Sequence, residues 1–148
     1  MSTIIEIADA IVAELNSPGE PGFSMLVHAE RHYKPTFDLA EMKDLRVTVV
    51  PRGVELSGAS RSMTQTDVQI DIGVQRKLPA DAASDAAEID ALMRLVEEIA
   101  DFFRSMRLSA CPNVSWVRTE NKPIYSPEHI EQLRQFTSVL TLTFRVLR

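Results

Sequence analysis

A run of strict two-residue alternation from Gln65 to Lys77 constrains the fold more than any other feature of this sequence. Apolar side chains take one set of positions and polar side chains the other: Val68, Ile70, Ile72 and Val74 against Asp67, Gln69, Asp71 and Gln75. Because successive side chains of a strand point to opposite faces, this pattern predicts a long strand with one buried and one solvated face. Such a division is typical of antiparallel sheets.

Five other segments have the composition or alternation of strands, namely 23–33, 45–50, 54–60, 114–119 and 136–147. Pro51-Arg52-Gly53 separates two of them and predicts a tight hairpin turn, because proline has no N–H to give to a ladder. The stretch over 38–44 is ambiguous, and we interpret it as a connecting turn. The small residues over 78–84 indicate a linker.

Apolar residues at helical spacing predict an amphipathic helix over 3–15 and a longer one over 85–106. The apolar stripe of the longer helix is wide, which leaves apolar surface for a neighbour. Ser126-Pro127 predicts a third, short helix ending near Gln132, because a capping hydroxyl followed by proline favours a helix start. We therefore expect a single α+β domain, with an antiparallel sheet packed against one long and one or two shorter helices.

Composition narrows the function classes. The chain has 148 residues and a formal net charge of −5, and its basic residues are scattered, which disfavours a surface that grips DNA. A lone cysteine, Cys111, rules out an intrachain disulfide and fits a reducing compartment. There is no apolar run long enough to span a membrane, and the first fifteen residues carry no basic side chain, so we expect neither membrane insertion nor secretion.

Two groups of residues could in principle carry chemistry. His28, Glu30 and His32 would share one face of a strand, and two imidazoles with a carboxylate can bind zinc or iron. Same-face neighbours on a strand lie about 7 Å apart, however, so a solvated strand face is the favoured interpretation. Cys111 and His129 lack any pattern that would assemble a catalytic triad. The isolated glycines form no phosphate-binding loop. We expect no enzyme, no cofactor and no metal.

The order of segments over nearly the whole chain resembles the tail terminator, or tail completion, proteins in the neck of long-tailed bacteriophages and prophages. The resemblance lies in the opening helix STIIEIADAIVAELN, the strand LRVTVVP and the long strand SRSMTQTDVQIDIGVQRK. It continues in the acidic helix EIDALMRLVEEIADFF and the closing strand TSVLTLTFRV. It is a likeness of arrangement, so it assigns no functional residue individually.

This resemblance implies a structural virion protein, assembled in the host cytoplasm, that forms a homo-oligomeric ring of six copies. Such a ring would cap the tail tube, end its polymerisation and join it to the head connector, while DNA passes through without sequence-specific contacts. Asp67 and Asp71 are then candidates to line the channel, where carboxylates would repel phosphates. Two alternatives stay open: another head-tail connector or adaptor, and a small metal-binding enzyme-like domain using His28, Glu30 and His32.

Overall fold

The computed structural model describes residues 3–19, 22–33, 45–79, 83, 85–104, 106 and 108–147. Within them lie three helices, α1 (Thr3–Asn16), α2 (Asp85–Phe103) and α3 (Pro127–Leu133). The strands are β1 (Ala29–Arg31), β2 (Arg46–Gly58), β3 (Thr64–Lys77), β4 (Val114–Glu120) and β5 (Gln135–Leu147). The predicted α+β class is confirmed. The predicted turn over 38–44 lies outside the described residues, as does most of the predicted linker over 78–84.

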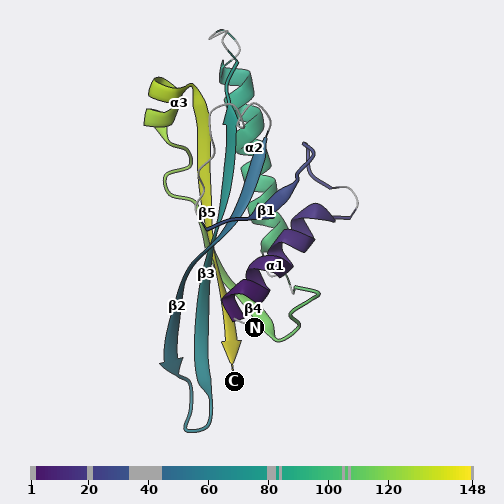
Figure 1. The fold of residues 1–148 in the computed structure, drawn as a ribbon, viewed down its shortest axis with the longest axis vertical. Helices are drawn as coiled ribbons and strands as arrows, with labels where there is room; N and C mark the ends of the chain where they lie inside the picture. The colour runs from purple at the N-terminus through teal and green to yellow at the C-terminus, as the bar shows by residue number, and fades with distance from the viewer. Residues whose placement is uncertain are drawn as a thin grey trace.

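The five strands form one sheet in the order β1-β2-β3-β5-β4. All pairs are antiparallel except β1 with β2, so the sheet is mixed and the prediction of a wholly antiparallel sheet is wrong in this detail. Parallel neighbours need a connection of a dozen or more residues, and the chain between Arg31 and Arg46 has that length. Helices α1 and α2 lie on the same face of the sheet, while α3 lies beside one end of β5 (Figure 1).

β2 runs straight through the predicted hairpin at Pro51-Arg52-Gly53, so that prediction is wrong. The Val49 carbonyl accepts a hydrogen bond from the His32 N–H (3.0 Å), which shows that Val49 turns its backbone polar groups towards β1. Pro51, two residues on, faces the same side, and the β1 pairing has already ended there. Its missing N–H therefore costs no ladder bond. A shift in register between Pro51 and Gly53 absorbs Arg52 as a bulge.

The turn that joins β2 to β3 comes later, where the Ala59 N–H donates to the Met63 carbonyl (3.1 Å). The other long strands follow the prediction closely. β3 and β5 each begin one residue earlier than predicted and end at the predicted residue. The segment over 23–33 alternates in burial as predicted, but only Ala29–Arg31 pairs as a strand. A local pattern reports which side chains are covered, whereas pairing also requires a neighbouring strand.

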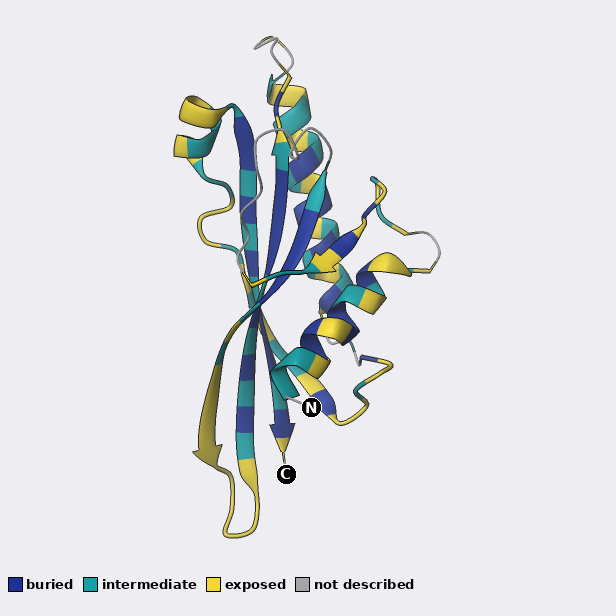
Figure 2. Ribbon diagram, in the orientation of Figure 1, coloured by how far each residue is buried: buried dark blue, intermediate teal, exposed yellow. Residues whose placement is uncertain are grey.

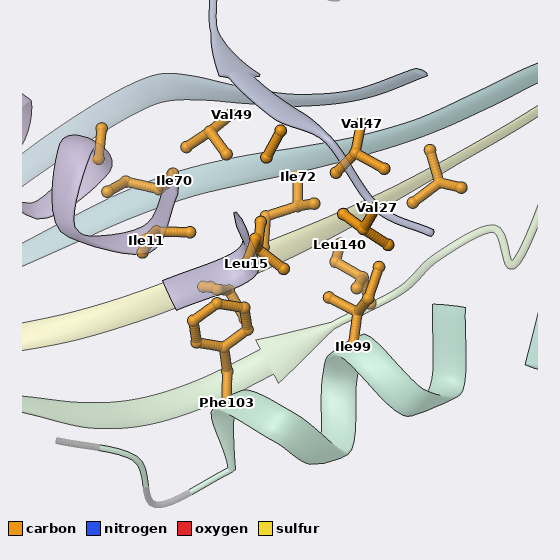
Figure 3. Packing of buried hydrophobic residues seen from close by; sticks show 14 of the residues in the cluster. Ile11, Leu15, Val27, Val47, Val49, Ile70, Ile72, Ile99, Phe103 and Leu140 are labelled. Atoms are coloured by element: carbon orange, nitrogen blue, oxygen red, sulfur yellow. The ribbon is translucent and has the colours of Figure 1, made fainter. Parts of the chain in front are cut away.

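The core lies between the helices and one face of the sheet. Figure 3 shows Ile11 and Leu15 of α1 and Ile99 and Phe103 of α2 pointing towards the sheet. The sheet contributes the apolar side chains of its central strands, among them Val47, Val49, Ile70, Ile72 and Leu140. Ile70 and Ile72 belong to the alternating face of 65–77 that was predicted to be buried. The apolar faces of α1 and α2, predicted from the helical spacing of their residues, are therefore the faces that pack on the sheet.

The short helix α3 begins as predicted. The Ser126 hydroxyl accepts a hydrogen bond from the His129 N–H (3.4 Å), and Pro127 occupies the first turn. The helix ends at Arg134, which adopts the left-handed conformation (φ 51°, ψ 46°). The Arg134 guanidinium reaches the Asp85 carboxylate at the start of α2, with contacts of 2.6 and 2.8 Å. One residue thus joins the ends of two helices.

Candidate interaction surface

The hairpin of β2 and β3 extends beyond the helices as a projecting arm, here defined as residues 52–65 (Figure 1). β1 pairs only with the stretch Val47–Val49, so among the described residues β2 is an edge strand from Pro51 onward. On the other side of the arm, β3 stays paired with β5 down to Gln65. One strand of the arm is therefore held inside the sheet, and the other has a free edge.

The face of the arm that continues the core face is left uncovered on β2. Val54 lies opposite Val68, and Leu56 lies opposite Thr66. Val68 and Thr66 are buried, but 51% of Val54 and 68% of Leu56 is exposed. Figure 2 shows this contrast between the exposed end of β2 and the partly buried β3 beside it. Met63, 41% exposed in the turn, adds to the same end of the molecule. An edge strand with exposed apolar side chains is a candidate surface for contact with another chain.

The opposite face of the sheet carries the predicted channel-lining residues, and there the structure pairs their charges. Asp67 lies directly across from Arg145, whose Nε and Nη2 donate to its two oxygens at 2.8 and 3.1 Å. These hydrogen bonds lower the pKa of Asp67. Asp71 accepts from the Thr141 hydroxyl (2.7 Å) and lies 3.5 Å from the Arg52 guanidinium. Both of these carboxylates, which were expected from the sequence to be sources of negative charge, are therefore paired with guanidinium groups.

A groove lies between α2 and β4, on the helix-covered face of the sheet. It encloses about 320 Å³ and is lined by apolar groups of Val96, Ala100, Trp116 and Leu140, together with the polar residues Glu97, Asp101, Arg104, Thr119 and Asn121. The Trp116 indole N–H donates to the Thr119 hydroxyl (2.9 Å), so the ring is fixed in the groove wall. This groove adjoins β4, the strand at the opposite side of the sheet from the free edge of β2.

The groove also accounts for part of the wide apolar stripe predicted for α2. Val96 and Ala100 both line it, but Val96 is buried in the core and only Ala100 is partly exposed there. Phe102, in contrast, packs edge-on against Phe23, with ring centroids 5.2 Å apart. Part of the apolar surface of α2 is thus covered by the chain's own Phe23. The spacing of residues in the helix does not reveal where that residue lies.

His28, Glu30 and His32 share one exposed side of the chain, as predicted, and the two histidines converge on the carboxylate. Nε2 of His28 lies 3.5 Å from one oxygen of Glu30, and Nε2 of His32 lies 3.0 Å from the other. The hydrogen bond with His32 lowers the pKa of Glu30. In this arrangement Glu30 bridges two imidazoles. Within the described part of the chain, no three His, Cys, Asp or Glu side chains are arranged to hold a metal ion.

Cys111 and His129 are not brought together. The Cys111 thiol is half-buried near α1, 3.8 Å from the Glu6 carbonyl, and burial with the nearby Glu6 carboxylate raises its pKa. His129 lies in α3, at the other end of the molecule in Figure 1, where its Nδ1 contacts the Thr137 hydroxyl (2.8 Å). A raised pKa lowers the thiolate fraction, which is the reverse of what activates a nucleophile.

No protein-family model matches this sequence. A search of curated proteins likewise found no match. Of the helices in the described ranges, none has both the length and the apolar character needed to cross a membrane.

Nothing in the local sequence marks Val54, Leu56 or Met63 as functional residues. Val54 and Leu56 alternate with polar neighbours and were indistinguishable from the core residues of an ordinary strand. Only the positions of the helices, which cover β3 but not this end of β2, leave them in solvent. The sequence offers one indirect signal, which is Pro51, because a proline within a strand is typical of an edge strand.

Proposed function

We propose that this protein is a structural component of a phage or prophage neck, a tail terminator whose copies join into a closed ring. The observation that carries the proposal is the apolar end of β2, with Leu56 68% exposed beside a strand edge that no described residue pairs. Burying apolar surface against a neighbour is favourable, and a ring subunit would cover this one in that way. The α+β architecture and the layout of the sequence support the same proposal.

Ring formation needs a contact between two different surfaces of the same chain. A contact that pairs one surface with a different one repeats from copy to copy, and it closes when the rotation between copies divides a full turn. The sheet order places two unlike edges at opposite sides, β2 with its projecting arm and β4 with its groove. Six copies is the number implied by the resemblance to tail terminators.

In this proposal the ring caps the tail tube on one side and meets the head connector on the other, and DNA passes through its centre. The polar face of β3 and β5 borders the passage. Its carboxylates at Asp67 and Asp71 lie beside the guanidinium groups of Arg145 and Arg52. Paired charges give this face little net attraction for phosphates, so the duplex slides past without adhering.

The proposal is tested by producing tails with and without this protein and imaging them by electron microscopy. We expect tubes of uniform length, capped by a ring, when the protein is present, and tubes of uncontrolled length when it is absent. Native mass spectrometry of the capped tails should release a species of six chains. If the protein is found on tails only as monomers, or if tube length does not depend on it, the terminator function is wrong.

The same experiment separates a terminator from another connector or adaptor. An adaptor would bind the head connector and restore head-tail joining, but it would leave the length of isolated tubes unchanged. Tubes of controlled length in a sample that contains no heads therefore favour the terminator.

A further inference from the structure

We propose that the arm of one copy docks into the groove between α2 and β4 of the next copy. This inference rests on the proposed ring function and identifies the two surfaces that form the ring contact. The occupant of the groove is thus a second copy of this chain, inserted by its Val54, Leu56 and Met63 side chains.

The apolar surfaces match in kind. The arm exposes three apolar side chains, and the groove of about 320 Å³ is lined on its apolar side by Val96, Ala100, Trp116 and Leu140. On the arm Val54, Leu56 and Met63 are exposed, and in the groove Ala100 and Trp116 are only partly buried, whereas Val96 and Leu140 are already covered by their own chain. Burial of apolar area contributes roughly 25 cal/mol per Å², so mutual cover of the two surfaces provides the driving force for the contact. An aromatic wall fixed by the Trp116–Thr119 hydrogen bond is typical of the centre of an interface.

The charges are complementary as well. Arg61 lies in the exposed turn of the arm and forms no ion pair with any described residue. The groove carries two exposed carboxylates, Glu97 and Asp101, and a single cation, Arg104, which is 3.9 Å from Asp101. One negative charge is therefore left in excess in the groove. Charge complementarity of this kind fixes orientation and raises the association rate.

The backbone of the arm favours docking by side chains over addition of a strand. Pro51 removes an N–H from the free side of β2, and the bulge after it interrupts the regular ladder. Both features are devices that keep an edge strand from pairing with another edge. The apolar side chains Val54 and Leu56 remain available on the face of that strand, which directs the contact into a groove.

The position of the two surfaces makes the contact heterologous. The arm belongs to the β2 side of the sheet and the groove to the β4 side, with β3 and β5 between them. Each copy can then give its arm to one neighbour and receive the arm of another. Such a contact does not form a two-fold dimer, and it generates a ring when the rotation between copies divides a full turn.

The test is a cross-link between copies in a Cys111→Ser background. One preparation carries Leu56→Cys on the arm, and the other carries Ala100→Cys in the groove. The two are mixed under conditions of assembly and treated with a short bis-maleimide. The matched control replaces Ala100→Cys by Ala87→Cys, an exposed position on the same helix about 20 Å away along its axis. We expect a cross-linked dimer with Ala100→Cys at a yield at least about tenfold above that with Ala87→Cys, because only a thiol in the groove lies within reach of the arm.

Charge reversal gives an independent readout. Arg61→Glu should weaken self-association at least about tenfold, as measured by analytical ultracentrifugation, and Glu97→Lys in the same chain should restore part of it. Glu55→Lys, also exposed on the arm but on its other face, is the matched control and should have a smaller effect.

The outcomes separate this inference from the proposed function. Rings that assemble without the arm-to-groove cross-link, and that tolerate Arg61→Glu, overturn the docking mode and leave the terminator function standing. Chains that stay monomeric on tails as well as in solution overturn both. Circular dichroism and thermal melting of each variant establish that the fold is intact, so a loss of association reports the contact itself.

Discussion

Arg145 donates two hydrogen bonds to Asp67 across the β3–β5 ladder, Nε to Oδ1 at 2.8 Å and Nη2 to Oδ2 at 3.1 Å. The two residues lie directly opposite each other on the face that turns away from α1 and α2. A paired guanidinium and carboxylate on adjacent strands stabilises the register of the sheet. The same face carries Asp71 with Thr141, so polar pairs join β3 to β5 at two levels.

The pKa of Asp67 is lowered by Arg145, and that of Asp85 is lowered by Arg134. A carboxyl whose pKa is lower in the folded chain binds its proton more readily after unfolding. We therefore expect its stabilisation to be complete above about pH 4, the range of an unfolded aspartate, and to be lost as the pH falls through the lower folded pKa. Urea unfolding of wild type at neutral and acidic pH measures this loss.

The variant Asp67→Asn tests the assignment. It should lower the urea midpoint at neutral pH and have a smaller effect under acidic conditions, where the wild-type pair is already weakened. Asp90→Asn, at an exposed position on α2, is the matched control and should change neither midpoint. Equal losses for Asp67→Asn at both pH values would contradict a role for the ionised pair.

Arg134 combines a left-handed backbone with the ion pair to Asp85, and the two contributions can be separated. Arg134→Ala and Arg134→Gly both remove the guanidinium, but glycine adopts a positive φ without the steric cost that a Cβ brings. We expect both to be less stable than wild type, with Arg134→Gly more stable than Arg134→Ala by about 1 kcal/mol. Urea denaturation gives the difference. An alanine variant as stable as the glycine variant would mean that the left-handed conformation is not retained.

Phe102 and Phe103 are adjacent in α2 but occupy different surroundings. Phe103 is fully buried in the core, whereas Phe102 is partly exposed and packs on Phe23. Phe103→Ala leaves a cavity in the core and should cost about 3–5 kcal/mol of unfolding free energy. Phe102→Ala should cost less, because solvent fills part of the space. Similar losses for both variants would contradict the burial that the fold assigns to them.

The Cys111 thiol should react slowly with alkylating reagents near neutral pH. Its pKa is raised by burial and by Glu6, so the reactive thiolate is scarce. The reference is an exposed thiol, Ala87→Cys in a Cys111→Ser background, at equal protein concentration. We expect iodoacetamide to modify the reference faster than wild type, as followed by intact mass. A faster reaction at Cys111 would indicate an activated thiol.

Asp71 offers a test of the channel face, because its charge is paired with that of Arg52. Replacing both Asp67 and Asp71 by lysine would oppose like charges across the strands, so Asp71→Asn is the cleaner change. It leaves Arg52 without a counter-charge, and if this face borders the DNA passage of the proposed ring, the net positive charge should slow DNA ejection. Ejection from particles that carry the variant is followed by fluorescence of released DNA. Unchanged ejection with intact rings would place this face outside the channel.

Local patterns in the sequence were sufficient to predict the long helices, the strands β3 and β5, and the Ser126 cap of α3. Alternation over 65–77 and helical spacing over 3–15 depend on which side chains face the core, and every residue contributes directly to that signal. The sharing of one face by His28, Glu30 and His32 was predicted for the same reason. Their convergence on Glu30 was not, because side-chain rotation is set by local contacts in three dimensions.

Tertiary structure decided whether Pro51 ends a strand, because the answer depends on how far β1 extends along β2. It also decided that Asp67 faces Arg145, since a cross-strand pair exists only once the register between β3 and β5 is set. The exposure of Leu56 has the same origin. Its alternation is that of a core residue, but burial needs a covering element, and the helices that cover β3 do not reach the end of β2. Hydrophobic character is a property of the residue, whereas cover is a property of the whole fold.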